Sequence, residues 1–221
     1  MSERDAVLAA VRRNLAGVEP PEPGVAPEVR IPGTATPTER LARFRAQLAS
    51  VGGRVEVARD ARVAAALLRD IVAEKGARTV AVSDAALARE LAAGLDGVDG
   101  VAVACDAERA FLLEADLGLS CAQWGIAETG TLVLESERER NRLVSLVPPV
   151  HVAVLQAGAI LATLGDALAA VRRPEHGAPS RAVTFITGPS RTGDIELTLV
   201  VGVHGPKELV VIVIDPEESE R

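Results

Sequence analysis

Short apolar segments alternate with amphipathic helical segments along the middle of the chain, and this alternation constrains the fold more than any other feature. In residues 61–75, for example, Leu67, Leu68 and Ile71 fall on one side of a helix. The expected strands are 54–57, 79–82, 100–104 and 115–122, and the expected helices are 38–50, 61–75, 84–95 and 106–113. Strands that are apolar throughout are typical of a parallel sheet covered on both faces. We therefore predict an α/β fold, with a mostly parallel sheet and helices on both faces.

The alternation becomes less regular after Trp124. Residues 125–130 are rich in Gly and precede an expected strand at 131–135, which indicates a hairpin or an irregular insertion. Further strands are expected at 151–155, 182–186 and 208–215, and a helix at 160–172. Three residues, Asp60, Ser83 and Asp106, each stand before a helical segment and are expected to cap it.

The first 36 residues differ in character from the rest. Residues 2–16 are expected to form a helix that Ser2 caps, with Val7, Leu8, Val11 and Leu15 on its apolar side. Six of the 13 prolines then fall between Pro20 and Pro37, which predicts an extended linker because Pro disfavours helix. We divide the chain into this N-terminal segment, 1–36, and an α/β domain, 37–221. The helix docks either on its own domain or on another subunit or partner.

The composition argues against nucleic acid as a partner. The net charge of −7 at pH 7 repels a phosphodiester backbone, and aromatic residues, on which bases stack, make up 2% of the chain. No apolar stretch reaches the length of a membrane span, and the charged N-terminus lacks the apolar region of a signal peptide.

Cys105 and Cys121 are the only two cysteines. Their wide separation argues against a disulfide framework and against iron–sulfur or zinc ligation, which requires clustered ligands. The three histidines show no paired spacing, so we expect no metal site. His151, near the start of a strand, is expected to bond a backbone group. We predict a cytoplasmic protein that binds no cofactor of its own.

Residues 125–131 crowd small and polar side chains between apolar segments. Gly130 would let the backbone approach a ligand, and Thr129 and Thr131 offer hydroxyl groups. No Lys follows Gly130, which excludes a nucleotide P-loop. Glu128 is the only ionisable group in this apolar run, and a carboxylate held there could act as acid, base or nucleophile. The alternative is a tight hairpin in which Glu128 faces water.

A second polar loop, residues 187–196, follows the expected strand 182–186. Loops at the carboxyl ends of parallel strands line the ligand crevice of such sheets. The candidate ligand-binding residues here are Gly188, Ser190, Arg191 and Thr192. Arg191 offers a planar fork for an anion, and Asp194 or Glu196 would orient it or accept a proton, which makes Asp194 a second catalytic candidate. The alternative is a surface loop with an ion pair.

His204 and Gly205 belong to a third polar loop. His204 lies between glycines and titrates near neutrality, which suits a general base, although a lone turn histidine is more often structural. We expect the loops 125–131, 188–196 and 204–206 to meet in one crevice that binds a small carboxylate or phosphate.

Three strings in the second half of the chain resemble a known family. They are GIAETGTLVLES, RLVSLVPPVHVAVL and TFITGPSRTGDIELTLVVGVHGPKELVVIVID. Together they are similar to the lactate-utilisation protein C family, whose members consist of a LUD domain, and the resemblance covers residues 125–215. It implies a fold similar to the NagB/RpiA/CoA-transferase superfamily. It also implies a role in oxidising L-lactate to pyruvate, beside two partner proteins that carry iron–sulfur clusters.

Two functions follow as alternatives. The chain is either a cluster-free component of a lactate-oxidising system, or a stand-alone enzyme that uses Glu128 or Asp194. The second alternative resembles CoA transferases, sugar-phosphate isomerases or formyltetrahydrofolate cyclo-ligase. A phosphate-binding Lys in the crevice would favour the enzyme, and the scarcity of lysines, Lys75 and Lys207 alone, favours the component.

Overall fold

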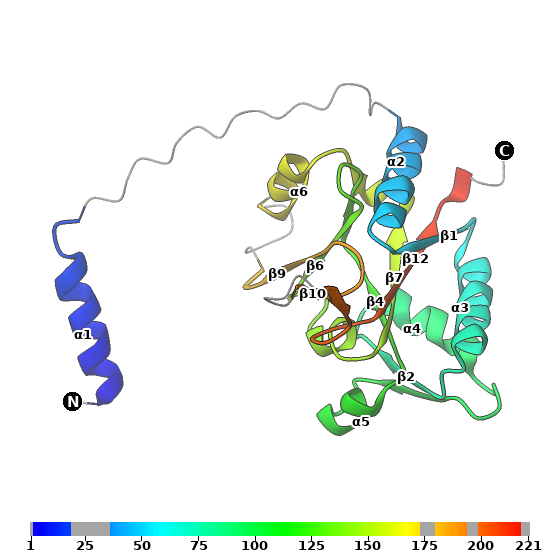
Figure 1. Ribbon diagram of the computed structural model, residues 1–221, viewed down its shortest axis with the longest axis horizontal. Coiled ribbons are helices and arrows are strands. Elements are labelled where there is room, and N and C mark those ends of the chain that lie inside the picture. The colour runs from blue at the N-terminus through cyan, green and yellow to red at the C-terminus, as the bar shows by residue number, and fades with distance from the viewer. Residues whose placement is uncertain (1, 19–35, 173–179, 194–198, 218–221) are drawn as a thin grey trace.

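The computed structural model describes residues 2–18, 36–172, 180–193 and 199–217. Its centre is a six-stranded sheet in which every neighbouring pair of strands runs parallel. In spatial order the strands are β1 (Arg54–Ala58), β12 (Glu208–Ile214), β7 (Val150–Gln156), β4 (Leu117–Cys121), β2 (Thr79–Val82) and β3 (Ala102–Cys105). The predicted α/β fold with a mostly parallel sheet is confirmed (Figure 1).

One face of this main sheet is covered by two helices. They are α3 (Ala61–Lys75) and α4 (Ala86–Ala92), the latter continued by the 3-10 turn η1 (Ala93–Leu95). Leu68 and Ile71 of α3 pack into one buried cluster with alternate strand residues such as Val152 and Ile212. Because successive strand residues point to opposite faces, the intervening residues must be buried by something else.

The opposite face is covered by helices and by a second sheet of four strands. The helices are α2 (Pro37–Ser50) and α5 (Arg109–Glu114), and the second sheet has the order β8 (Ile160–Leu161), β5 (Trp124–Ile126), β6 (Thr131–Glu135) and β9 (Val183–Ile186). Phe44 of α2 packs in one cluster with Leu132 of β6 and Val211 of β12. Leu112 of α5 packs against Ala81 of β2. Helices therefore lie on both faces, as predicted.

The outer side of the second sheet carries α6 (Leu164–Val171), whose Ala167 packs with Ile126 and Val133 (Figure 1). Two further strands, β10 (Arg191–Gly193) and β11 (Leu199–Val201), pair antiparallel with each other. Short 3-10 turns, η2 (Arg142–Ser145) and η3 (Ala157–Ala159), flank β7.

Several elements have the bounds that the sequence predicts, among them α3, β2 and β6. Residues 160–172 differ from the expectation of one helix. Ile160 and Leu161 form the edge strand β8, and α6 starts after Thr163, which forms a capping box with Asp166. The expected strand 182–186 exists as β9, but it pairs antiparallel with β6 in the second sheet and is not part of the parallel sheet.

Asp60 caps α3 as predicted, because its Oδ1 accepts a backbone N–H of the first turn at 2.8 Å. The capping predictions for Ser83 and Asp106 are wrong. The Ser83 hydroxyl donates instead to Glu139 at 3.1 Å. Asp106 has a positive φ of 55° and forms an ion pair with Arg89 at 2.7 Å. In both cases the side chain bonds a partner that is distant in sequence, and neither side chain caps its helix.

The N-terminal helix α1 (Glu3–Leu15) forms where it was predicted, with Ser2 and Asp5 in a reciprocal capping box. None of its residues is buried, and Val7 and Leu15 are 62% and 61% exposed. The predicted linker lies mostly outside the described residues. Among the helices that are described, none is long and apolar enough to cross a membrane.

The turn between β5 and β6 packs directly against the end of α2. Gly130 in this turn has a φ of 65°, and a Cβ atom there would collide with the backbone of Gln47 and Leu48. Leu48 is itself fully buried. The close approach of turn and helix therefore requires Gly at position 130.

We expect Gly130→Ala to lower the free energy of unfolding by roughly 2–5 kcal/mol, because a left-handed backbone cost and a steric collision add. Gly76→Ala is the matched control, since Gly76 has a φ of 60° with nothing within 4 Å of its Cβ position. Urea denaturation of both variants measures the difference. Equal losses would contradict the close packing of the turn on α2.

Candidate functional site

Glu128, the first catalytic candidate, lies beside the start of α6. Its backbone N–H donates to the Ala162 carbonyl at 3.1 Å, and its Oε2 accepts the backbone N–H of Leu164 at 3.3 Å. Helix N-termini leave such N–H groups without partners and favour negative charge. The geometry accounts for Glu128 as an acceptor at this helix end, and its catalytic role stays a prediction.

Threonine hydroxyls join the first predicted loop to the second. Thr129 Oγ1 lies 2.6 Å from Thr131 Oγ1, which lies 2.7 Å from Thr187 Oγ1. Thr131 is buried, so this chain of hydroxyls runs into the protein. The two loops are therefore neighbours, although Gly130 contacts α2.

Arg191, the anion-binding candidate, holds the end of α2. Its Nη2 donates to the carbonyl of Val51 at 2.5 Å. Val51 follows the last residue of α2, where unpaired carbonyl groups favour a cation. Thr192 follows Arg191 in β10, and Asp194, the second catalytic candidate, lies outside the described residues. An anion contact of Arg191 also stays a prediction.

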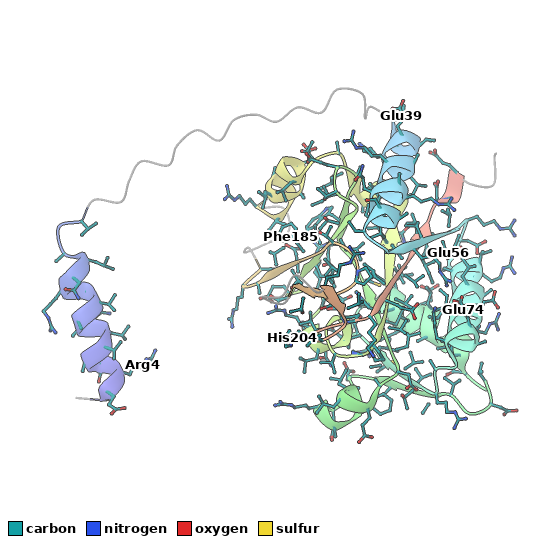
Figure 2. The ribbon with its side chains drawn as sticks, viewed as in Figure 1. Arg4, Glu39, Glu56, Glu74, Phe185 and His204 are labelled. Atoms are coloured by element: carbon teal, nitrogen blue, oxygen red, sulfur yellow. The ribbon has the colours of Figure 1, made fainter. Side chains whose placement is uncertain are left out.

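A cavity of about 210 Å³ opens at the β9 edge of the second sheet. It lies between β9 with its following loop, the end of η2, residues 204–206, and the first residues of β7 and β12. Its polar lining residues are Ser145, His151, Thr184, Thr187, Ser190 and His204. Phe185 and His204, which both line it, lie on the same side of the α/β domain (Figure 2). We call this space the β9 cavity.

Four predicted ligand-binding residues meet in the β9 cavity: Gly188, Ser190, His204 and Gly205. Backbone hydrogen bonds join the two loops that carry them, from Ser190 N–H to the Pro206 carbonyl at 2.8 Å and from Gly202 N–H to the Ser190 carbonyl at 2.9 Å. The second and third predicted loops therefore share one site. Among the described residues, the first loop contributes none to the lining of the cavity, and the Thr131–Thr187 hydrogen bond connects it to the cavity.

His151 lines the β9 cavity from the main sheet. It is fully buried, its Nε2 lies 2.8 Å from Ser120 Oγ, and its Nδ1 has no hydrogen-bond partner among the residues that the structure describes. The expected backbone partner is wrong, because Ser120 on the neighbouring strand β4 takes that place. Burial lowers the pKa of His151 to about 4, so the ring is neutral near pH 7.

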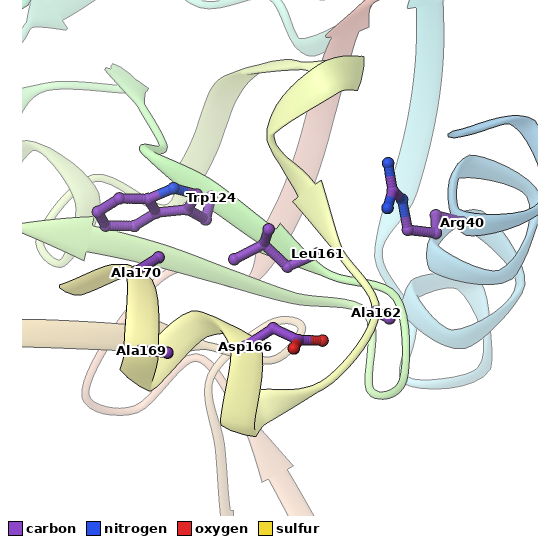
Figure 3. Close-up of a pocket in the computed structure, with 7 residues that line it drawn as sticks. All are labelled: Arg40, Trp124, Leu161, Ala162, Asp166, Ala169 and Ala170. Carbon is purple, nitrogen blue, oxygen red and sulfur yellow. The ribbon is translucent and has the colours of Figure 1, made fainter. Parts of the chain in front are cut away.

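A second cavity, of about 340 Å³, lies at the opposite edge of the second sheet, between α2, β5, β8 and α6 (Figure 3). Arg40 is the cation among its described lining residues. The carboxylate of Asp166 also lines it, but this carboxylate already binds Thr163 in the cap of α6. None of the predicted site residues that the structure describes lines this cavity. We therefore regard the β9 cavity as the stronger candidate.

A buried carboxyl group lies apart from both cavities, at the carboxyl edge of the main sheet. Glu139 is 2% exposed, and its Oε1 accepts hydrogen bonds from the Cys121 N–H at 2.6 Å and from the Ser83 hydroxyl at 3.1 Å. Cys121 ends β4, and Ser83 directly follows β2. After β2 the chain continues to α4 on one face of the main sheet. After β4 it continues to the second sheet, which covers the opposite face. Such a divergence marks the crevice where open α/β sheets bind ligands.

Glu139 has an unusual affinity for protons. Burial raises its pKa to about 7, and the charge of Asp84 adds to the rise, while the hydrogen bonds from Cys121 and Ser83 oppose it. A carboxyl group with a pKa near 7 can both donate and accept a proton at neutral pH. This combination of position and pKa makes Glu139 a second functional candidate.

Sequence reasoning missed Glu139. It lies in the charged run ESERER, which is typical of a solvent-facing turn. The Glu139 N–H donates to the Glu135 carbonyl at 2.9 Å, and this turn brings Glu139 back onto the sheet. Its partner Ser83 is 56 residues away in sequence, so no local pattern could have identified the contact. No cluster of three metal-ligating side chains occurs within the described residues.

Comparison with known proteins identifies the domain. Residues 41–214 match the LUD domain. The chain belongs to the LUD domain family. A solved structure of a DUF162 family protein from Deinococcus radiodurans has the same fold, with a TM-score of 0.57 and 22% sequence identity, over 81% of this chain and 98% of that one.

Curated relatives of this LUD domain protein match it over part of the chain. An uncharacterised protein of Neisseria meningitidis is 44% identical over 48% of this chain and 46% of its own length. Proteins named Lactate utilization protein C are 40% identical in Anoxybacillus flavithermus, over 45% of this chain and 44% of the relative, and 38% identical in Geobacillus thermodenitrificans, over 46% and 43%. Each match spans less than half of the relative.

The pKa values of Glu139 and His151 predict opposite effects of pH on stability. The raised pKa of Glu139 means that the folded protein holds this proton between about pH 4.5 and 7, so stability falls as the pH rises through that range. The lowered pKa of His151 means that the unfolded chain takes up a proton between about pH 6.5 and 4, so stability falls as the pH drops. Each effect is worth roughly 3 kcal/mol, and the two oppose each other where the ranges overlap.

Glu139→Gln should therefore raise the free energy of unfolding at pH 8 by up to roughly 3 kcal/mol, since an amide keeps the acceptor oxygen and removes the buried charge. In this variant stability should increase with pH from about 4 to 6.5, because the His151 effect remains and the opposing Glu139 effect is removed. Glu137→Gln, at an exposed position in the same turn, is the control. Chemical denaturation across pH 4–8 measures both, and a destabilised Glu139→Gln variant at pH 8 would contradict the raised pKa.

Proposed function

We propose that this LUD domain protein is a component of an L-lactate utilisation system. In this role it carries no iron–sulfur cluster and acts with iron–sulfur partner proteins that oxidise L-lactate to pyruvate. The observation that carries the proposal is its similarity to two proteins named Lactate utilization protein C. We also place it in the cytoplasm, where thiols such as the exposed Cys105 stay reduced.

The chemistry of lactate oxidation supports a division of labour. The reaction removes two electrons from the substrate, and side chains alone do not accept them, so a cofactor must do so. An iron–sulfur cluster takes four protein ligands, mostly Cys, whereas this sequence holds two cysteines. In the described structure Cys121 is buried at the end of β4 and Cys105 is exposed at the end of β3, and β2 lies between these two strands. Iron–sulfur clusters in the partner proteins would accept the electrons that this chain has too few cysteines to accept through a cluster of its own.

The β9 cavity supports a binding contribution from this chain. Its volume of about 210 Å³ suits a small molecule, and hydroxyl and imidazole groups line it. Polar groups in a partly apolar cavity fix the orientation of a ligand. The protein would bind or orient a substrate or product of the partners, and electron transfer would take place elsewhere.

The proposal is tested by reconstitution. Purified protein alone should show no lactate:acceptor activity, whereas a mixture with the two iron–sulfur partners should oxidise L-lactate to pyruvate. Omitting this chain should lower the activity strongly, measured by reduction of a soluble electron-acceptor dye. Equal activity of the partners without this chain would refute the component role.

The N-terminal helix provides a route to the partners. Its exposed apolar residues Val7, Leu8, Val11 and Leu15 form one side of α1, and amphipathic helices bind by laying such a side into an apolar groove. Deleting residues 1–36 should weaken the complex with the partners at least tenfold. The domain should stay folded, because α1 contributes no buried residue.

Analytical ultracentrifugation of the full and truncated chains with the partners measures this effect. Leu8→Ala with Leu15→Ala is the sharper variant, since it keeps the helix and removes only apolar surface, and Arg4→Ala with Arg12→Ala is the control. Unchanged binding of the truncated chain would show that α1 does not dock on these partners. The truncation also removes Thr36, which caps α2, so only a loss of domain stability well beyond the roughly 1 kcal/mol of that cap would indicate docking in cis.

A stand-alone enzyme that resembles CoA transferases, sugar-phosphate isomerases or formyltetrahydrofolate cyclo-ligase is the second candidate. Glu139 favours it, because a carboxyl group with a pKa near 7 at the carboxyl edge of a parallel sheet suits general acid–base catalysis. Turnover of a CoA ester, a sugar phosphate or a folate by the chain alone, lost in Glu139→Gln, would favour this candidate over the component role.

A further inference from the structure

The unpartnered nitrogen of His151 is the feature of the β9 cavity that neither the fold nor the proposed role explains. A buried polar atom without a hydrogen bond is costly and is rare in folded proteins. The ring is fully buried, its Nε2 bonds Ser120, and Nδ1 has no partner within the described part of the chain. His151 lines the cavity, and a ligand there that contacted Nδ1 would supply the missing bond.

The other groups around the cavity restrict the charge of that ligand. No Lys or Arg occurs among the described lining residues. The backbone N–H groups of Ser190, Gly202 and Lys207 already donate to carbonyl groups of the protein. A phosphate dianion would find neither cations nor these amides to replace its water, and the desolvation of such a charge is expensive. Hydroxyl and imidazole groups suit an uncharged or singly charged molecule.

We propose that His151 Nδ1 binds the hydroxyl or carbonyl oxygen of a small ligand that carries at most one negative charge. The choice of hydroxy and keto acids as probes rests on the proposed function, whereas the contact with His151 rests on the cavity itself. His151 is neutral, so one ring nitrogen carries a proton and the other accepts.

The Ser120 hydroxyl lets this contact serve both members of a hydroxy/keto pair. If His151 Nε2–H donates to Ser120 Oγ, Nδ1 is an acceptor for a ligand hydroxyl. If the Ser120 hydroxyl donates to Nε2, Nδ1–H is a donor for a ligand carbonyl. Because a hydroxyl both donates and accepts, Ser120 stabilises either tautomer. The pair Ser120–His151 can therefore hold an alcohol and the corresponding ketone in one place.

Nitrogen-15 NMR of histidine-labelled protein tests the proposal directly, since a protonated and an unprotonated ring nitrogen resonate far apart. L-Lactate, pyruvate, glycolate and glycerol are the small probes, and 3-phosphoglycerate, which carries a phosphate dianion as well as a carboxylate, is the highly charged probe. We expect lactate to leave Nδ1 unprotonated and pyruvate to leave it protonated. If none of the small probes shifts the His151 resonances, or if 3-phosphoglycerate binds more tightly than L-lactate, the proposal is wrong.

Two substitutions separate a ligand contact from a structural role. The amide of His151→Gln reaches the position of Nε2 and can keep the bond to Ser120, while it loses Nδ1. The shorter amide of His151→Asn reaches the position of Nδ1 and loses the bond to Ser120. We expect Gln to weaken lactate binding by roughly tenfold or more and Asn to weaken it less, measured by calorimetry. The reverse order would assign His151 a structural role only.

Ser120→Ala covers the case in which His151→Gln does not fold, because it keeps the ring. Without the bond to Ser120 the ring is no longer fixed before a ligand binds, so L-lactate and pyruvate should both bind more weakly although each still selects its own tautomer, and unchanged affinity for both would refute the role of Ser120. These measurements use this chain alone. If lactate or pyruvate binds through His151 but adding this chain does not change lactate oxidation by the partners, the proposed function is wrong. The inference about His151 would still hold.

Discussion

The pairing of β7 with β12 is the interaction on which the rest of the structure depends. The two strands run parallel in register over seven residues, from Glu208 with Val150 to Ile214 with Gln156, and both lie inside the main sheet. Their side chains must be buried on both faces, because they are apolar almost throughout. On one face of the main sheet, helices α3 and α4 bury these side chains. On the other face α2 covers only part, and the second sheet completes the core around Val211. The β9 cavity lies where this second sheet meets the first residues of β7 and β12, so the site is a consequence of how the second face is closed.

The sequence predicts the main sheet well because each of its strands is a short, mostly apolar segment, and β1, β2 and β3 also lie between helical segments. The second sheet is harder to predict from the sequence. Ile160 and Leu161 continue smoothly into a helical pattern, and only the capping box at Thr163 separates strand from helix. The strand 182–186 is apolar enough for either sheet, and its pairing with β6 is a contact between distant residues that periodicity does not encode. The correct strand was therefore assigned to the wrong sheet.

The candidate site was predicted in part for a similar reason. Gly and polar residues in loops are visible locally, and Gly188, Ser190 and Gly205 do meet in the β9 cavity. The sequence also identifies Arg191 as a candidate, but its guanidinium donates to the carbonyl of Val51 at the end of α2. Val51 is 140 positions away, so the sequence does not indicate this contact. His151 lies in an apolar strand, where a polar residue signals either a core hydrogen bond or a ligand contact. Its partner Ser120 is 31 residues away, so the sequence could not distinguish these cases.

Strand β4 connects the two buried ionisable groups of interest. Consecutive residues, Ser120 and Cys121, hold them: the Ser120 hydroxyl bonds His151, and the Cys121 N–H bonds Glu139. Burial favours the neutral form of each side chain, which lowers the pKa of the imidazole and raises that of the carboxyl. Near pH 6 the folded protein therefore keeps both uncharged. Because one bond comes from a side chain and the other from the backbone of the next residue, a displacement of the end of β4 would alter both at once. The β9 cavity and the carboxyl edge of the sheet are thus joined by a single strand.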